Sequence, residues 1–210
     1  MTRLAVLSDY PEEGWPSMDL AASMLVEAGR RIGPPELDVA EICPPFRRLA
    51  TRLPALGARR AALNADRLLN RMWHYPRCAA GLRTRFDLFH VADHSYAQLV
   101  HALPPERTGV FCHDLDAFRS ILDPGREPRP AWYRAIARRV LAGLGRAAVV
   151  FHSTDPIREE ILRHGLVPAE RLVKVAYGTA AEFVPTGPGG APGAAPGSYL
   201  LHVGSCIARK

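Results

Sequence analysis

Polar residues with useful chemistry stand at the ends of two apolar, strand-like segments. His113 ends the segment 108–113 and is followed by Asp114, while Ser153 follows the segment 147–152. In doubly wound α/β sheets, ligands bind beyond the carboxyl ends of the strands. A histidine there can hydrogen-bond a hydroxyl group or transfer a proton at neutral pH, or it can cap a turn or fill the core. We predict His113 as the catalytic residue and Asp114 and Ser153 as ligand contacts; Asp114 is equally suited to capping the next turn.

A single glycine, Gly14, lies in the loop between the first strand-like segment and the first helical pattern. A glycine in such a loop lets backbone N–H groups approach an anion closely, and the following helix adds the positive end of its dipole. The alternative is an ordinary turn. The loop has one glycine where a GxGxxG dinucleotide fingerprint has three, which argues against a nicotinamide dehydrogenase.

A metal site is the competing interpretation of three other residues, His90, Asp93 and His94. Positions 90 and 94 would share one face of a continuous strand, so both imidazoles could bind the same ion. A fourth ligand with motif spacing is missing from the sequence. We therefore predict no metal and no cofactor.

Strand-like segments alternate with helical patterns along the chain, which predicts βαβ units and a parallel sheet with flanking helices. The first helix is expected to begin at Ser17 as N-cap and to bury a face containing Leu20, Met24, Leu25 and Ala28. The segment 46–83 is mostly helical in pattern. The expected strands are 4–8, 37–43, 87–91, 108–113, 147–152 and 172–177, and the other expected helices are 97–102, 131–144 and one opening at Asp155-Pro156.

A segment rich in proline and glycine, 185–198, separates this pattern from one further strand-like run, 199–204. Its composition is typical of a linker. We expect an N-terminal Rossmann-like domain over 1–184, a linker over 185–198, and the first strand of a second, truncated domain over 199–210. The alternative is that the last run adds an edge strand to the first sheet.

Six short motifs occur in an order that resembles the family-4 retaining glycosyltransferases of the GT-B fold. They are the Gly14 loop, Asp87-Leu88-Phe89-His90, His113-Asp114, the Ser153 turn, Val175-Ala176-Tyr177-Gly178 with Phe183-Val184-Pro185, and His202-Val203-Gly204-Ser205 with Arg209-Lys210. The resemblance covers essentially the whole chain. Ala176-Tyr177-Gly178 departs from the family's usual asparagine-glycine turn. The family's later Glu-x7-Glu pair would lie beyond residue 210.

The resemblance implies a hexose-type sugar moved from a nucleotide-sugar donor to a saccharide or lipid-linked acceptor, with retention of configuration. It places Gly14 beside the donor phosphates and makes Arg209 and Lys210 the pair that neutralises the departing diphosphate; a solvated basic tail is the alternative. His90 would contact the sugar or the acceptor. The chain alone is expected to be inactive, because the resemblance puts most of the donor site in the second domain. A GT-B epimerase and a non-catalytic Rossmann-like binding module are the rival hypotheses.

The net charge of +6 comes almost entirely from arginines scattered among Ala, Gly and Pro, without aromatic clustering, and so predicts no nucleic-acid partner. Four cysteines without metal spacing and the lack of a signal-peptide core predict a cytoplasmic protein. The arginine-rich segment 126–146 is either a solvated helix face or a peripheral contact with an anionic membrane surface.

Overall fold

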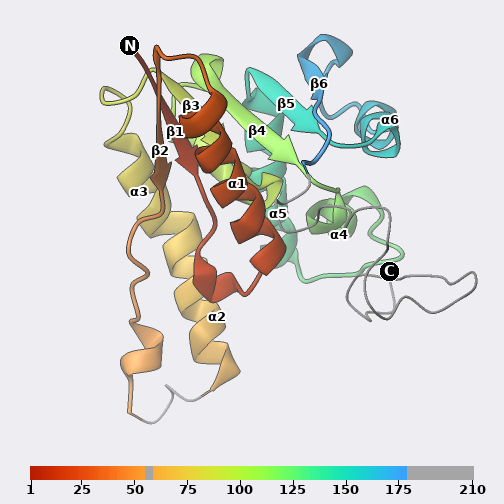
Figure 1. Cartoon of the computed structure of the whole chain (residues 1–210). Coiled ribbons are helices and arrows are strands. Elements are labelled where there is room, and N and C mark those ends of the chain that lie inside the picture. Colours follow the sequence, from red (N-terminus) through yellow and green to blue (C-terminus); the bar gives the residue numbers. More distant parts are fainter. Residues whose placement is uncertain (55–58, 179–210) are drawn as a thin grey trace, which may run out of the picture. The chain divides into compact units, whose positions relative to one another are not determined.

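Parallel strands alternate with helices along the chain, as the sequence predicts (Figure 1). The computed structural model describes residues 1–54 and 59–178, and Met1–Tyr177 form one unit. The strands are β1 (Thr2–Leu7), β2 (Leu37–Ile42), β3 (Leu88–Val91), β4 (Thr108–Cys112), β5 (Val149–His152) and β6 (Leu172–Lys174). The α-helices are α1 (Pro16–Ile32), α2 (Arg60–Leu69), α3 (Tyr75–Ala80), α4 (Arg119–Leu122), α5 (Ala131–Arg146) and α6 (Asp155–Arg163). The shorter turns are η1 (Pro11–Glu13), η2 (Ala50–Arg52), the π turn η3 (Asn70–His74), η4 (His94–His101), η5 (Pro105–Arg107), η6 (Asp116–Phe118) and η7 (Ala169–Arg171).

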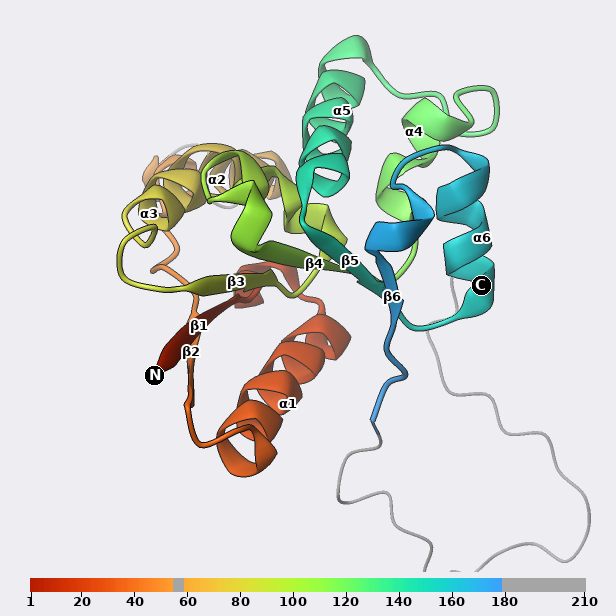
Figure 2. The ribbon, with the colours of Figure 1, turned by 90° about the horizontal axis from the view of Figure 1, so that it is seen from above.

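The described strands form one parallel sheet in the order β2-β1-β3-β4-β5-β6. The chain therefore leaves β1 toward one edge of the sheet and later returns to build the other edge from β3. Right-handed crossovers in these two directions place their helices on opposite faces. Figure 2 shows α1 on one face and α2, α3 and α5 on the other. This sheet order makes the fold an α/β, Rossmann-like one.

Helix α1 begins earlier and buries a different face than the sequence predicts. Its N-cap is Trp15 and Pro16 occupies the first turn, so the prediction of Ser17 as N-cap is wrong. Proline is common at this position because its fixed φ suits a helix and because an N–H group in the first turn would have no partner within the helix. Leu20 and Leu25 are 49% and 39% exposed. The residues of α1 that pack on the sheet are small or branched, Ala22 and Val26.

The larger core lies on the face covered by α3, η4 and α5. Helix α5 and η4 approach so closely that a Cβ atom added at Gly143 would lie 2.0 Å from the carbonyl oxygen of Ala97. No side chain fits in that gap. This close contact explains why a glycine occurs inside α5, although glycine is unfavourable in a helix.

The remaining boundaries differ from the predicted ones by a few residues. The predicted strand 172–177 ends at Lys174, the helix predicted at 97–102 is the turn His94–His101, and α5 continues to Arg146. The predicted linker 185–198, strand 199–204 and domain boundary after residue 184 lie outside the described residues. Within 1–54 and 59–178, no helix is long and apolar enough to cross a bilayer.

Candidate active site

Four strand ends converge at one point on the carboxyl edge of the sheet. Asp9 lies two residues after β1 and Asp93 two residues after β3, while His113 and Ser153 directly follow β4 and β5. Strands β1 and β3 are neighbours whose connections leave toward opposite faces. The crevice at such a switch point is where open α/β sheets bind ligands.

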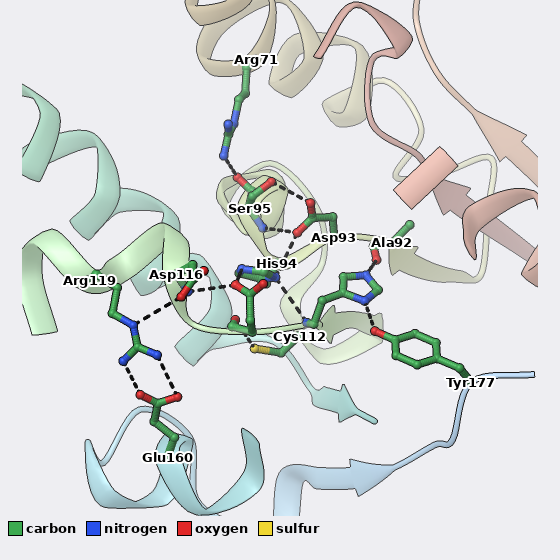
Figure 3. Close-up of polar contacts among 12 residues, drawn as sticks. Arg71, Ala92, Asp93, His94, Ser95, Cys112, Asp116, Arg119, Glu160 and Tyr177 are labelled. Carbon is green, nitrogen blue, oxygen red and sulfur yellow. Dashed lines mark hydrogen bonds and ion pairs between the residues drawn. The ribbon is translucent and has the colours of Figure 1, made fainter. Parts of the chain in front are cut away.

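His94 is a buried imidazole that lies between two carboxylates (Figure 3). Its Nδ1 atom lies 3.0 Å from Oδ1 of Asp93, and its Nε2 atom lies 3.4 Å from Oδ1 of Asp114. Burial disfavours the charged ring, but the charge of Asp93 and the contacts with both carboxylates prevail and raise the pKa of His94 to about 9. The backbone N–H of His113 also points at Nδ1 of His94, at 3.4 Å. The group therefore consists of a buried imidazole in contact with one buried and one exposed carboxylate.

Asp93 is the most strongly bound member of this group. Burial opposes its ionisation, but the charge and hydrogen bond of His94 hold its pKa well below the usual range. The backbone N–H and the hydroxyl of Ser95 also donate to it, at 2.8 and 3.0 Å. Arg71 in turn donates to the carbonyl of Ser95 (Figure 3). These contacts fix the Asp93 carboxylate beside the β1 loop.

Asp9 faces Asp93 as a neutral carboxylic acid. Burial, the negative charge of Asp93 and a hydrogen bond with it raise the pKa of Asp9 to about 9, although Arg71 opposes the shift. Only 5% of Asp9 is exposed, and its Oδ1 atom has no hydrogen-bond partner among the described residues. A protonated acid beside a charged one can donate one hydrogen bond and accept another. Such a displaced pKa at a switch point is typical of functional sites.

His113 is an uncharged imidazole with both nitrogens engaged. Its Nε2–H donates to the carbonyl oxygen of Ala92 at 2.8 Å, so Nδ1 accepts the hydrogen bond from the hydroxyl of Tyr177 (Figure 3). Burial lowers its pKa, against the smaller raising effects of Ala92 and Asp93. The ring also stacks on Phe111, with centroids 4.6 Å apart. Proton transfer from a ligand to His113 therefore requires the Tyr177 hydroxyl to leave Nδ1, the nitrogen that can accept a proton.

Asp114 and Ser153 lie beside this pair. The carboxylate of Asp114 accepts from the N–H of Asp116 at 2.8 Å, so it caps the next turn and also faces His94. Ser153 is buried. Burial raises the pKa of Tyr177, while hydrogen bonding by Ser153 lowers it. The strand-end residues predicted from the sequence thus lie together, with Tyr177 as their common neighbour.

The loop after β1 is held in a fixed conformation by contacts with η4 and α2. Gly14 has φ 72° and ψ 43°, a left-handed conformation that ends the turn η1, and its N–H donates to the carbonyl of Pro11. The hydroxyl of Tyr96 donates to Glu13 at 3.2 Å, and Arg67 donates to the carbonyl of Glu12 at 2.9 Å. Glycine is therefore required here by backbone geometry. Its role beside a phosphate stays a prediction.

His90 lies within β3, one residue before the strand ends. Its ring packs against Phe151, with centroids 5.4 Å apart, and burial lowers its pKa to about 4. The strand ends at Val91 and His94 begins η4, so His90 and His94 do not share a strand face as the metal hypothesis assumed. Within the described ranges, no group of three His, Cys, Asp or Glu residues is arranged to hold a metal ion. Arg209 and Lys210 lie outside the described residues.

Asp9 is the residue that the sequence analysis missed, and Asp93 and His94 were considered only as metal ligands. The available signal was an aspartate shortly after each of two strand-like segments, Leu4-Ala5-Val6-Leu7-Ser8-Asp9 and Phe89-His90-Val91-Ala92-Asp93. The two carboxylates become neighbours only because β3 returns to pair with β1. That pairing is a property of the whole sheet.

Several solved structures are similar to this chain, and one of them is a UDP complex. It is described as "Crystal structure of LpCGTa in complex with UDP"; it is 12% identical, and the match covers 86% of this chain and 53% of the other, with a TM-score of 0.47. This chain thus spans about half the length of that protein. The fold is assigned from the order and direction of the strands in the sheet. No family model matches the sequence, and no curated protein has a significantly similar sequence.

Proposed function

We propose that this chain forms the acceptor-side domain of a glycosyltransferase that uses a nucleotide-sugar donor. The observation that carries the proposal is the cluster of Asp9, Asp93, His94 and Asp114 at the switch point of the sheet. Sugars are recognised through many hydroxyl groups, each of which can donate and accept a hydrogen bond. A carboxyl group with a raised pKa, two further carboxylates and an imidazole at one edge offer both kinds of partner.

The finer part of the proposal follows the motif order. The donor would be a nucleotide-activated hexose, and the product would keep the anomeric configuration. An acceptor hydroxyl oxygen would bond to the anomeric carbon as the bond to the diphosphate oxygen breaks, and its proton would pass to the leaving phosphate. His113 would contact the transferred sugar or the acceptor hydroxyl. Gly14, Arg209 and Lys210 would lie beside the diphosphate, whose developing charge needs positive partners.

The test is a transfer assay of the full-length gene product with UDP-, GDP-, ADP- and TDP-hexoses. Release of the nucleoside diphosphate is measured with and without saccharide and lipid-phosphate acceptors, and proton NMR of the product gives its anomeric configuration. We expect acceptor-dependent release and a retained configuration. His113→Gln should lower kcat by about 100-fold, since loss of one positioned polar group at the reacting centre typically costs this much. Circular dichroism of the variant checks that it is folded under the assay conditions.

Two outcomes would contradict the proposal. Absence of binding to every nucleotide sugar, measured by calorimetry on the same preparation, would rule out the donor class. Turnover of the sugar nucleotide to an epimer without any acceptor would favour the epimerase alternative.

A further inference from the structure

A cavity lies where the loop after β2 crosses α2, η3 and α3, and none of the carboxylates of the candidate active site line it. Its volume is about 540 Å³, within the range of small-molecule sites. The lining residues are Arg47, Leu49, Leu69, Asn70, Trp73, His74, Arg77 and Cys78. We call it the β2-loop pocket.

The wall of the β2-loop pocket is held by buried polar side chains. Asp66 is fully buried and accepts from the N–H groups of Leu49, Ala50 and Thr51 at 3.0, 2.7 and 3.1 Å. Asn70 is 1% exposed. Its side chain accepts a hydrogen bond from the N–H of Arg47 at 2.8 Å and donates one to the carbonyl oxygen of Arg47 at 2.7 Å. The loop is therefore fixed through its main chain.

Three apolar side chains that line the β2-loop pocket are strongly exposed. Trp73 is 62%, Leu49 is 57% and Leu69 is 47% exposed. Water-facing apolar groups around one hollow mark a binding site more often than an ordinary surface. The π turn Asn70–His74 contributes three of the lining residues, and such turns are frequent at functional sites.

The charge of the β2-loop pocket is one-sided. Its lining contains Arg47 and Arg77 and no acidic residue. Within the described part of the chain, neither guanidinium has a carboxylate within 4 Å in an ion pair. Arg77 instead lies over the ring of Trp73, 3.3 Å from its centroid. Unpaired guanidinium groups beside an apolar hollow complement an anionic head attached to an apolar chain.

We propose that the β2-loop pocket binds an anionic amphiphile. A phosphate or similar head would lie between Arg47 and Arg77, and the apolar chain would cover Leu49, Leu69 and Trp73. The geometry also relates the pocket to the candidate active site, because His74 hydrogen-bonds the hydroxyl of Tyr10 at 3.4 Å. Tyr10 directly follows Asp9. The binding itself stands whether or not the protein transfers a sugar; if it does, this ligand is a candidate acceptor.

The test uses the fluorescence of Trp73 in a Trp15→Phe/Trp132→Phe background, since these are the three tryptophans of the chain. The probes are dodecyl phosphate below its micelle concentration, dodecanol and inorganic phosphate. We expect saturable one-to-one binding of dodecyl phosphate, with dodecanol and inorganic phosphate each at least 10-fold weaker. Cosedimentation with phosphatidylcholine vesicles, with and without phosphatidic acid, then distinguishes a bilayer lipid from a free amphiphile as the source.

Arg47→Gln and Arg77→Gln should each weaken binding about 10-fold or more, because each removes a charge-assisted contact. Arg47→Gln keeps the backbone contacts with Asn70, so it should remain folded by circular dichroism. The matched control is Arg138→Gln on the exposed face of α5, which should bind normally.

Equal binding of inorganic phosphate and dodecyl phosphate would overturn the proposal, because it would indicate a simple anion site. Unchanged binding in both pocket variants would do the same, and so would a loss in Arg138→Gln as large as in Arg47→Gln. No binding of dodecyl phosphate or of acidic vesicles would exclude the ligand class, without bearing on the transfer assay of the full-length protein.

Discussion

Asp9→Asn should stabilise the protein at neutral pH, although it removes a buried group from the candidate site. Asp9 is protonated in the folded protein, with a pKa of about 9 against 3.8 for the free side chain. At pH 7 the unfolded chain carries Asp9 ionised, so folding must add a proton to it. A difference of about 3 pH units between 3.8 and 7 corresponds to a cost of about 4 kcal/mol. Asparagine is neutral at every pH, and its NH2 group can still donate to Asp93.

The sign of the pH dependence follows from the same shift. A raised pKa means that the contribution of Asp9 to stability is fully present below pH 3.8 and is lost as the pH rises through about 9. The advantage of Asp9→Asn should therefore be near zero at pH 4 and grow by about 1.4 kcal/mol per pH unit up to pH 8.

The assay is urea unfolding of both proteins at unit steps between pH 5 and pH 8, with the free energy extrapolated to water. Asp38→Asn on the exposed face of β2 is the matched control and should change stability by less than about 0.5 kcal/mol at each pH. A stability difference for Asp9→Asn that is flat across this range would refute the reasoning, because it would show that Asp9 is ionised in the folded state.

Three further substitutions test the framework around the sites. Asp66→Ala should lower the free energy of unfolding by about 3 kcal/mol, because it leaves buried N–H groups unpaired. Hydrogen bonds from Thr51 and the loop backbone outweigh burial and lower the pKa of Asp66 to about 2, so in urea unfolding the wild-type advantage should be full above pH 4 and shrink by about 2.5 kcal/mol as the pH falls through 2. Gly143→Ala should lower the calorimetric unfolding midpoint by several degrees, since its methyl group would overlap the carbonyl of Ala97, whereas Gly145→Ala, at 3.4 Å from the nearest carbonyl, should cost much less. Gly14→Ala should cost only about 1 kcal/mol in urea unfolding, because the added Cβ meets open space and the left-handed backbone alone is strained. A loss from Gly14→Ala as large as that from Gly143→Ala would contradict this explanation.

Local patterns predicted the elements of the fold well, because each strand and helix depends mainly on neighbours in the sequence. The apolar runs near Leu4, Leu88 and Val149 are strands of the parallel sheet, as predicted. The prediction of which side of α1 is buried was wrong. Helical spacing identifies the apolar residues of a helix, but it does not show which of them contact the sheet. The first residue of η4, His94, is polar and yet buried, because most of η4 lies inside the molecule.

The candidate site was only partly predictable, for a different physical reason. His113, Asp114 and Ser153 could be inferred because they come directly after strand-like segments, the first two after β4 and the third after β5. Asp9 needed knowledge of which strands pair, since its pKa depends on a carboxylate 84 positions away in the sequence. Tyr177 lies beyond the last described strand, and its contact with His113 has no counterpart in the sequence pattern.

The way in which Asp66 and Asn70 hold the β2 loop has a consequence for how this protein can change over time. Both residues contact the loop almost entirely through its peptide groups, which every amino acid except proline provides alike. Substitutions at Arg47 or Leu49 therefore leave the anchorage intact while altering what the hollow accepts. Ligand preference and folding are encoded by different residues here, so a lineage can diversify the first without endangering the second.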